Sequence, residues 1–293
     1  MNEPYSCISR MEGLEIRNPE ITLIRSKSGI SLYRVTAQGR RLVLKVFEKQ
    51  EDTREIENYR ILSLLGIPTL PLLGHTENAI LLPDVEAEEE YRLGRERDLR
   101  DPQVAGAIAK WYRTLHIKGR EYLSGKESPL GGERGMYDES DAITPENMRR
   151  VARETGSADD ALWKVIAENY HRIRSRIDAL PRTLTYNDFY WTNLIVAKNG
   201  KSALMFDYNL LGKGIAYGDV RNVTCSLSQK AAEIFMREYG EDIPMEQKKA
   251  DAFIAPLVTL HAACEQELFP SWAEGALKEL KNGSILRSLE DLL

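Results

Sequence analysis

Two polar residues near the middle of the chain have types and spacing that could hold a metal ion. Asn193 directly precedes the apolar run 194–196, and Asp207 directly follows the apolar run 203–206. An Asn-Gly pair at 199–200 separates the runs and is the strongest short signal for a β-hairpin turn. Because a hairpin brings its outer ends together, we expect Asn193 and Asp207 to lie side by side.

An amide oxygen and a carboxylate that converge on one point form the hard-oxygen site that Mg²⁺ prefers. Asp188 lies on the loop that leads into the hairpin, so its carboxylate can face whatever the metal holds. We therefore interpret Asn193 and Asp207 as metal ligands and Asp188 as a catalytic carboxylate. The alternative is that Asp188 caps a turn and that the other two residues only flank a hairpin.

Strand patterns dominate the first 85 residues. Residues 21–35 and 40–48 contain β-branched and apolar runs separated by short turns, which is typical of a hairpin meander. Residues 52–66 predict a helix, because apolar residues recur close to the helical period and Gly66 ends the pattern. Two further strand runs follow between residues 69 and 85.

The second part of the chain is mostly helical in pattern. Residues 86–101 are dense in charge, and we expect a solvated connector there. We expect an α+β protein with a strand-rich N-terminal lobe, residues 1–85, and a larger C-terminal lobe, residues 86–293. The larger lobe has one strand-like island at 183–210, a loop over 128–141, and helical spacing over 102–119, 146–179, 226–241 and 246–268.

The segment YNDFYWTN resembles the catalytic loop of the aminoglycoside phosphotransferase family, whose usual form is His-Gly-Asp-x-x-x-x-Asn. Asp188 and Asn193 match the family aspartate and asparagine at the right spacing. The later segments FDY at 206–208 and AYGDVRN at 216–222 resemble the metal-binding aspartate and an element that braces the loop through Asp219.

Two departures from the family form lie beside the catalytic residue. Tyr186 stands where the family has histidine, and Asn187 stands where it has glycine. The histidine usually braces the loop, and a tyrosine can also hydrogen-bond. We therefore expect the mechanism to survive while the detailed shape of the loop differs.

The resemblance extends into the first lobe and implies nucleotide-binding roles there. Lys45, in the middle of an apolar strand, resembles the kinase lysine that holds the α- and β-phosphates. Glu55 is the expected partner of this lysine, with Glu57 in reserve. The remaining implied positions are the phosphate-covering turn, Ser28 and Gly29, and the backbone that meets adenine, Asp84 and Val85.

The resemblance therefore implies a bilobal, protein-kinase-like fold and an ATP- or GTP-dependent enzyme that uses Mg²⁺. It implies transfer of the γ-phosphate to a hydroxyl group of a small molecule, such as an aminoglycoside-like compound, a sugar or an amino alcohol. The alternative is a catalytically inactive nucleotide-binding relative with a regulatory or scaffold role, which the Tyr186-Asn187 pair keeps open. A protein substrate is not expected, because the stretch from Asp207 to Asp219 is too short for a long activation segment.

Acidic and aromatic residues near the C-terminus have two interpretations. Glu265, Glu267, Phe269 and Trp272 could line a pocket for a cationic acceptor, or the aromatic rings could simply pack between helices. Helix packing is the simpler interpretation of the two rings. The sequence does not identify the acceptor or the oligomeric state.

Composition excludes several classes of partner. The net charge is −5 and the pI is about 5.6, which argues against a broad nucleic-acid surface. Three widely spaced cysteines give no disulfide or metal-ligand pattern and fit a reducing cytoplasm. The first 20 residues lack the features of a signal peptide, and no apolar run approaches the roughly 20 residues that span a bilayer. We expect a cytoplasmic protein with no membrane partner.

Overall fold

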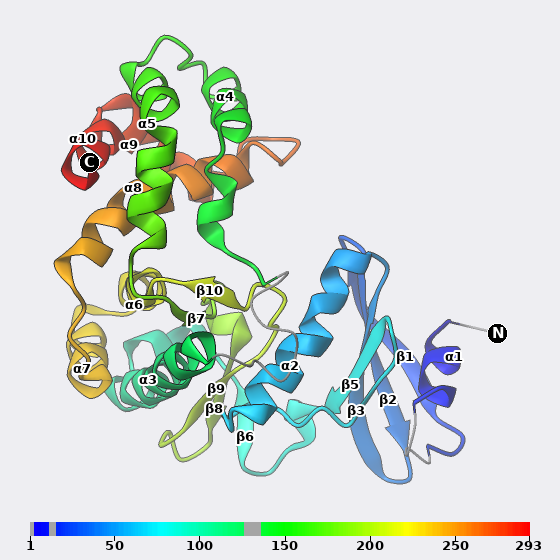
Figure 1. Ribbon diagram of the computed structural model, residues 1–293. Coiled ribbons are helices and arrows are strands. Elements are labelled where there is room, and N and C mark those ends of the chain that lie inside the picture. The colour runs from blue at the N-terminus through cyan, green and yellow to red at the C-terminus, as the bar shows by residue number, and fades with distance from the viewer. Residues whose placement is uncertain (1–2, 12–15, 126–135) are drawn as a thin grey trace. The chain divides into compact units, whose positions relative to one another are not determined.

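Figure 1 shows the computed structural model, which describes residues 3–11, 16–125 and 136–293. The chain divides into two compact units, each assembled from separate segments. The first unit comprises Met1–Lys118, Tyr186–Leu211 and Asn222–Gly240; the second comprises Gly119–Thr185, Gly212–Arg221 and Glu241–Leu293. The lobe boundary between residues 85 and 86 stays a prediction.

A five-stranded antiparallel sheet dominates the first unit (Figure 1). Its strand order is β1-β2-β3-β5-β4, with β1 Glu20–Lys27, β2 Ile30–Ala37, β3 Arg40–Phe47, β5 Ala79–Pro83 and β4 Gly74–His75. The predicted meander is therefore confirmed. One face of the sheet packs against the short helix α1, Glu3–Ser9, where Val35, Leu44 and Val46 form an apolar cluster with Cys7 and Ile8. Since side chains alternate along β3, Val43 and Lys45 face the other way.

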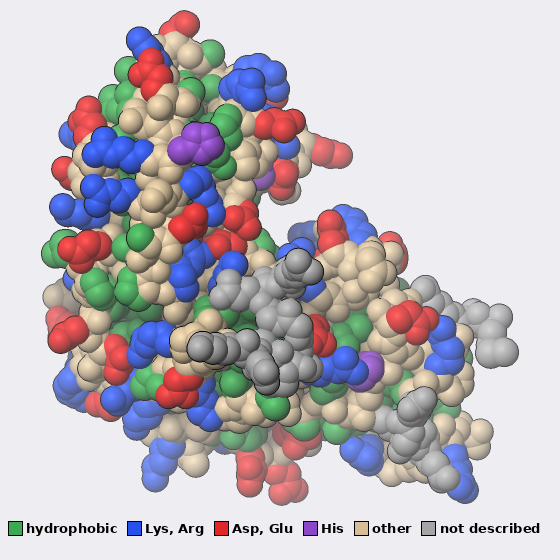
Figure 2. Space-filling model, in the orientation of Figure 1, with side chains coloured by type: hydrophobic (Ala, Val, Ile, Leu, Met, Phe, Trp, Pro, Cys, Tyr) green, Lys and Arg blue, Asp and Glu red, His purple; other side chains and the backbone are tan. Residues whose placement is uncertain are grey.

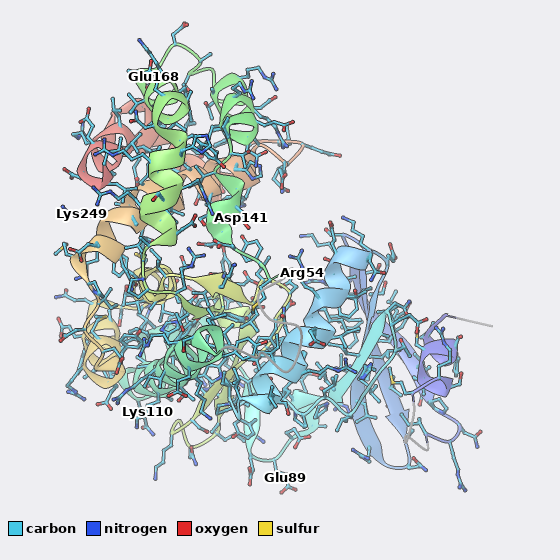
Figure 3. All side chains as sticks on the ribbon, in the orientation of Figure 1. Arg54, Glu89, Lys110, Asp141, Glu168 and Lys249 are labelled. Atoms are coloured by element: carbon cyan, nitrogen blue, oxygen red, sulfur yellow. The ribbon has the colours of Figure 1, made fainter. Side chains whose placement is uncertain are left out.

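Helix α2, Arg54–Leu64, follows a short 3₁₀ turn, η1, Gln50–Thr53. Arg54 lies at its N-terminal end (Figure 3). Its buried residues include Ile56, Tyr59 and Leu62, the face that the sequence predicts. Gly66, just beyond the helix, has a left-handed φ of 59°, the conformation that glycine adopts most readily after a helix C-terminus.

The charged segment 86–101 is largely exposed, as expected of a solvated connector, but it also contains short regular elements. It forms η2 Val85–Ala87, β6 Tyr91–Leu93 and η3 Glu96–Arg100. Strand β6 pairs with β8 in a three-stranded sheet of order β6-β8-β9. Asp98 is 3% exposed, because it accepts hydrogen bonds from the Arg92 guanidinium and from the Arg95 amide. The charge of Asp98 is therefore satisfied internally, whereas most other charged residues of the segment, such as Glu89 and Glu90, are exposed.

The hairpin predicted around Asn199-Gly200 is present as β8, Leu194–Ala197, and β9, Ala203–Met205. Gly200 takes the left-handed φ of 71° that the turn requires. Helix α3, Pro102–Ser124, contributes to the first unit up to Lys118, and α7, Gln229–Tyr239, completes it. Lys110 lies on α3 (Figure 3).

The second unit is mainly helical and has its own apolar core. That core joins residues of α4, α5, α8, α9 and α10, including Val151, Ile166, Phe253, Leu280 and Leu289. The elements are η4 Glu139–Ala142, α4 Pro145–Glu154, α5 Ala161–Asp178, β7 Thr183–Thr185, β10 Gly212–Gly214, α8 Met245–Ala263, η6 Ser271–Ala273, α9 Glu274–Lys281 and α10 Ser284–Leu292. Helix α6, Ala216–Ser226, belongs to this unit up to Arg221 and to the first unit from Asn222.

Helices α4, α5, α7 and α8 match the helical ranges that the sequence predicts, whereas α6, α9 and α10 were not predicted. The predicted loop over 128–141 lies partly outside the described residues, and its described end contains η4.

Surface charges of both signs are interspersed on the visible face of the molecule (Figure 2). This mixture agrees with the small net charge of −5. No helix in the part of the chain that the structure describes is both long enough and apolar enough to cross a lipid bilayer.

Candidate active site

Lys45 lies at the centre of a charge cluster within the first unit. Its ammonium group is 2.5 Å from a carboxylate oxygen of Glu55 on α2 and 2.7 Å from one of Asp207, just after β9. Glu57, the reserve candidate, pairs with Arg60 at the surface instead. Burial acts to lower the pKa of Lys45, but the two carboxylates outweigh burial and raise the pKa above its usual value. Lys45 is therefore a charged, well-held cation.

The catalytic loop brings Asp188 and Asn193 into direct contact. The Asn193 side-chain amide donates to the Asp188 carboxylate at 2.8 Å and to the Asp188 carbonyl at 3.2 Å. Burial, followed by the charge of Asp207, raises the pKa of Asp188 to about 6, while the Asn193 hydrogen bond and Lys45 act in the opposite direction. A carboxylate with a pKa near the working pH is suited to accept a proton.

Both departures from the family form have a clear structural role. The Tyr186 hydroxyl donates to the Phe206 carbonyl at 2.5 Å, so the tyrosine braces the loop by a hydrogen bond. Asn187 has a left-handed φ of 66°, and its side-chain amide donates to the Leu210 carbonyl. Asparagine is among the few residues other than glycine that adopt this conformation readily. The loop therefore keeps a backbone shape that a glycine would allow.

Buried aromatic rings support the loop from behind. Tyr186 packs edge-on against Tyr208, with ring centroids 5.8 Å apart, and Tyr208 packs edge-on against Tyr59 of α2 at 4.9 Å. Trp111 of α3 contacts both Tyr186 and Tyr208. This column links the helix that carries Glu55 to the catalytic loop, so the two cannot shift independently without breaking ring contacts.

The outer ends of the hairpin meet, as the sequence predicts. Leu194 pairs with Met205, and the Phe206 amide donates to the Asn193 carbonyl at 3.2 Å. The amide oxygen of Asn193 and the carboxylate of Asp207 form a donor set that suits Mg²⁺. Within the described residues, no group of three or more His, Cys, Asp or Glu side chains could hold a metal alone. Since Mg²⁺ is usually bound by one or two protein carboxylates plus substrate phosphates, this sparse set fits it.

A cavity of about 350 Å³ lies beside the charge cluster. The side chains of Ile30, Leu32, Val43 and Leu82 make an apolar part of its wall, and Lys45, Glu55 and Asp207 make a polar part. An apolar slot that leads to cations can hold a flat base with attached phosphates.

Ser28 lies on the wall of this cavity, whereas Gly29 shapes the turn beside it. The φ angles of the two residues, 55° and 85°, are both positive, as a two-residue hairpin loop requires.

Asp84 and Val85 are not among the residues that line this cavity. The Asp84 amide donates to the Arg41 carbonyl, and its carboxylate pairs with Arg34 and Arg41. This aspartate therefore anchors the end of β5, and its contact with adenine stays a prediction.

Gly94 is a site-supporting residue that the sequence did not indicate. A β-carbon built on Gly94 would lie 2.4 Å from the Trp191 carbonyl oxygen and 2.8 Å from the Leu194 β-carbon. Its amide donates to the Leu194 carbonyl at 2.6 Å. Only a residue without a side chain lets the 86–101 segment approach the catalytic loop this closely.

The remaining candidates lie in the second unit. Asp219 is buried on α6, and its bracing role stays a prediction. Phe269 and Trp272 are 42% and 54% exposed, so the packing interpretation of these rings was wrong. Glu265 lies 3.7 Å from Arg150.

The sequence of this chain matches a known protein family. A sequence model of the phosphotransferase enzyme family, APH, matches residues 20–246. The chain belongs to this family. This membership confirms the resemblance to the aminoglycoside phosphotransferases and makes the protein a phosphotransferase enzyme. A comparison with curated proteins gives no significant match.

Solved structures of phosphotransferases share the fold. A choline/ethanolamine kinase family protein from Mesorhizobium loti is 14% identical, with a TM-score of 0.63; the match covers 97% of this chain and 96% of that one. A macrolide 2′-phosphotransferase from Brachybacterium faecium is 16% identical, with a TM-score of 0.58 and coverage of 92% and 94%.

A spectinomycin phosphotransferase, solved with ADP and spectinomycin, is 12% identical, with a TM-score of 0.54 and coverage of 97% and 96%. These likenesses confirm the α+β, protein-kinase-like fold class that the sequence predicts.

Proposed function

We propose that this family member transfers the γ-phosphate of ATP or GTP to a hydroxyl group of a small molecule, with Mg²⁺ as the metal. The observation that carries the proposal is the position of Lys45, held between Glu55 and Asp207 on the wall of a cavity with an apolar slot. Removing a lysine and its carboxylate partners from water costs free energy, and such desolvated, interacting charges beside a cavity favour a functional role.

Six positions have proposed roles around the nucleotide. Lys45 binds the α- and β-phosphates, and Glu55 orients it. Ser28 and Gly29 cover the phosphates, and the backbone of Asp84 and Val85 meets the adenine. A similar structure was solved with ADP, which supports a nucleotide as the donor.

Asn193 and Asp207 would hold Mg²⁺ through their side-chain oxygens. When bound, the ion neutralises charge on the phosphates. The chain's part is to present the two oxygens, and Lys45 keeps the Asp207 carboxylate in place at 2.7 Å.

Asp188 orients the acceptor hydroxyl and accepts its proton late in the transfer. Its pKa of about 6 leaves the carboxylate mostly ionised at neutral pH, and the Asn193 amide fixes one of its oxygens. Catalysis of this kind depends on positioning and charge more than on covalent chemistry.

The acceptor is proposed to be an aminoglycoside-like compound, a sugar or an amino alcohol. The similar structures are described as acting on a macrolide, on choline or ethanolamine, and on spectinomycin, all of them small molecules. A cytoplasmic location stays a prediction; Cys7, Cys225 and Cys264, all among the described residues, form no disulfide.

An inactive nucleotide-binding relative is the alternative, and the loop geometry weighs against it. Tyr186 and Asn187 hold the catalytic loop in place by hydrogen bonds. Lys45, Asp188 and Asn193 are all retained.

The test is a panel of hydroxylated small molecules, cationic and neutral, incubated with ATP or GTP in the presence and absence of Mg²⁺. We expect Mg²⁺-dependent nucleotide turnover that rises with at least one acceptor. Nucleotide binding by calorimetry without turnover on any acceptor would favour the inactive relative.

A further inference from the structure

Two cations on the edge strand β1 line the same cavity as Lys45. Arg25 and Lys27 both lie on its wall, together with Asp207. Strand β1 is the outermost strand of the sheet beside β2 (Figure 1). The two cations precede the Ser28-Gly29 turn and have no role in the proposed function as stated above.

A β-bulge turns these side chains toward the cavity. The pairing of β1 with β2 shifts between Leu23, which faces Tyr33, and Arg25, which faces Leu32, so Ile24 is an extra residue. Residues opposite each other on neighbouring strands share a face of the sheet. Tyr33 packs into the apolar cluster on the far face, whereas Leu32 lines the cavity. Without the bulge, simple alternation would place Arg25 on the same face as Leu23.

The register places Arg25 in line with Lys45. Arg25 faces Leu32 on β2, and Leu32 faces Lys45 on β3, so the two cations lie in one row across three strands. Lys27 faces Ile30, in the next row toward the turn. Two residues along a strand span about 7 Å, so a second positive row follows the first at that distance.

On the other side of the Lys45 row the cavity wall is apolar. Val43 faces Leu82, two residues before Lys45 along β3. Along the strands, the cavity wall is therefore apolar at Val43 and Leu82, positively charged at the row of Arg25 and Lys45, and positively charged again at Lys27. A ligand with a flat apolar end and an extended anionic tail matches that order.

The charges on this wall do not balance. Lys45 is matched by Glu55 and Asp207. Among the described residues, Arg25 and Lys27 form no ion pair, and both are exposed. The cavity therefore has two cations available to an anion, beside a turn that contains a single glycine and so offers little backbone to wrap phosphates.

We propose that Arg25 and Lys27 form a phosphate clamp, with Arg25 binding the phosphates near Lys45 and Lys27 binding the terminal phosphate. This proposal rests on the proposed function, because it takes a nucleoside triphosphate as the ligand. The clamp replaces the backbone amides of a glycine-rich turn with charged side chains, which bind phosphate by charge-assisted hydrogen bonds.

The experiment measures ATP, ADP and AMP binding by titration calorimetry to the full chain and to two variants. Arg25→Gln should weaken ATP and ADP binding roughly 10- to 100-fold. Lys27→Gln should weaken ATP binding by a similar factor and ADP binding much less. AMP binding should stay within about twofold in both variants, and the loss of ATP affinity should shrink at high salt.

Arg40→Gln is the matched control. Arg40 begins β3 of the same sheet, is exposed, and does not line the cavity, so the charge change is the same without the contact. Wild-type affinity for ATP in both clamp variants would overturn the clamp and leave the proposed function standing, and so would an equal loss for AMP. Failure of the unmodified chain to bind any nucleotide would overturn both.

Discussion

At the residue scale, two carboxyl groups, those of Glu55 and Glu139, have a pKa that is raised to about 7. Glu55, 1% exposed, is held by the Lys45 ammonium at 2.5 Å, but burial outweighs this ion pair and raises the pKa of Glu55 to about 7. Glu139 belongs to the second unit. Burial raises its pKa to about 7; Arg221 opposes this shift, while Asp219 and Asp251 add to it. Burial therefore makes the ionised form of both carboxylates costly, and Glu139 is the one with no role in the proposed function.

The pH dependence of that cost gives a prediction for Glu139→Gln. Because the folded-state pKa is raised from 4.5 to about 7, the folded state loses stability as pH rises through this window. Above pH 7 the Glu139 carboxyl group is ionised in both the folded and the unfolded state, and the full loss of folding stability is present. The variant should therefore be more stable than the wild type by about 1–3 kcal/mol at pH 8, and by much less at pH 5.

Urea unfolding of both proteins at the two pH values measures this difference. Glu168→Gln is the control, because Glu168 is an exposed residue of α5 (Figure 3) and its substitution should have little effect at either pH. An advantage for Glu139→Gln that is equal at pH 5 and pH 8 would rule out the raised pKa as its cause.

At the scale of elements, local sequence patterns predict the strands of the first sheet and the catalytic hairpin. They do not predict the contacts that residues 86–101 make. Strand β6 has only three residues, and Arg92 between Tyr91 and Leu93 carries a charge that Asp98 neutralises within the same segment. A three-residue strand within a charged and largely exposed segment has no strand signal in the sequence. The bulge at Ile24 also has no signal in the sequence. It changes the face of the sheet on which Arg25 lies, but no proline or glycine is present at the bulge.

The contact of this segment with the catalytic loop gives a prediction for Gly94→Ala. The added methyl group would lie 2.4 Å from the Trp191 carbonyl, so the loop that carries Asn193 must move. We expect a loss of stability of about 1–3 kcal/mol and a fall in turnover of at least roughly tenfold.

Gly275→Ala serves as the control for Gly94→Ala. Gly275 lies in α9 with nothing within 4 Å of a built β-carbon, and alanine there should stabilise the helix by up to about 1 kcal/mol. Thermal unfolding and phosphotransfer rates are measured for both variants. If Gly94→Ala keeps wild-type turnover and stability, the close approach does not position the loop.

At the scale of the whole molecule, the sequence was sufficient for the fold class and for the residues that meet at the charge cluster. Lys45 and Asp207 are 162 positions apart, yet each lies in a strongly patterned strand or hairpin, so the family form indicates both. The helices of the second unit were only partly predicted, since α9 and α10 are short and gain stability by packing against α8. Long-range packing of this kind has no local signal.

The central claim is that Asp188 orients and deprotonates the acceptor hydroxyl, whereas Lys45 binds the nucleotide and Asn193 and Asp207 bind the metal. The most direct measurement compares turnover and ATP affinity in Asp188→Ala with those of the wild type. We predict a loss of turnover of at least roughly 10²-fold, as expected when a group that accepts a proton is removed, with ATP affinity changed by less than about threefold. Equal losses of turnover and ATP affinity would contradict the claim.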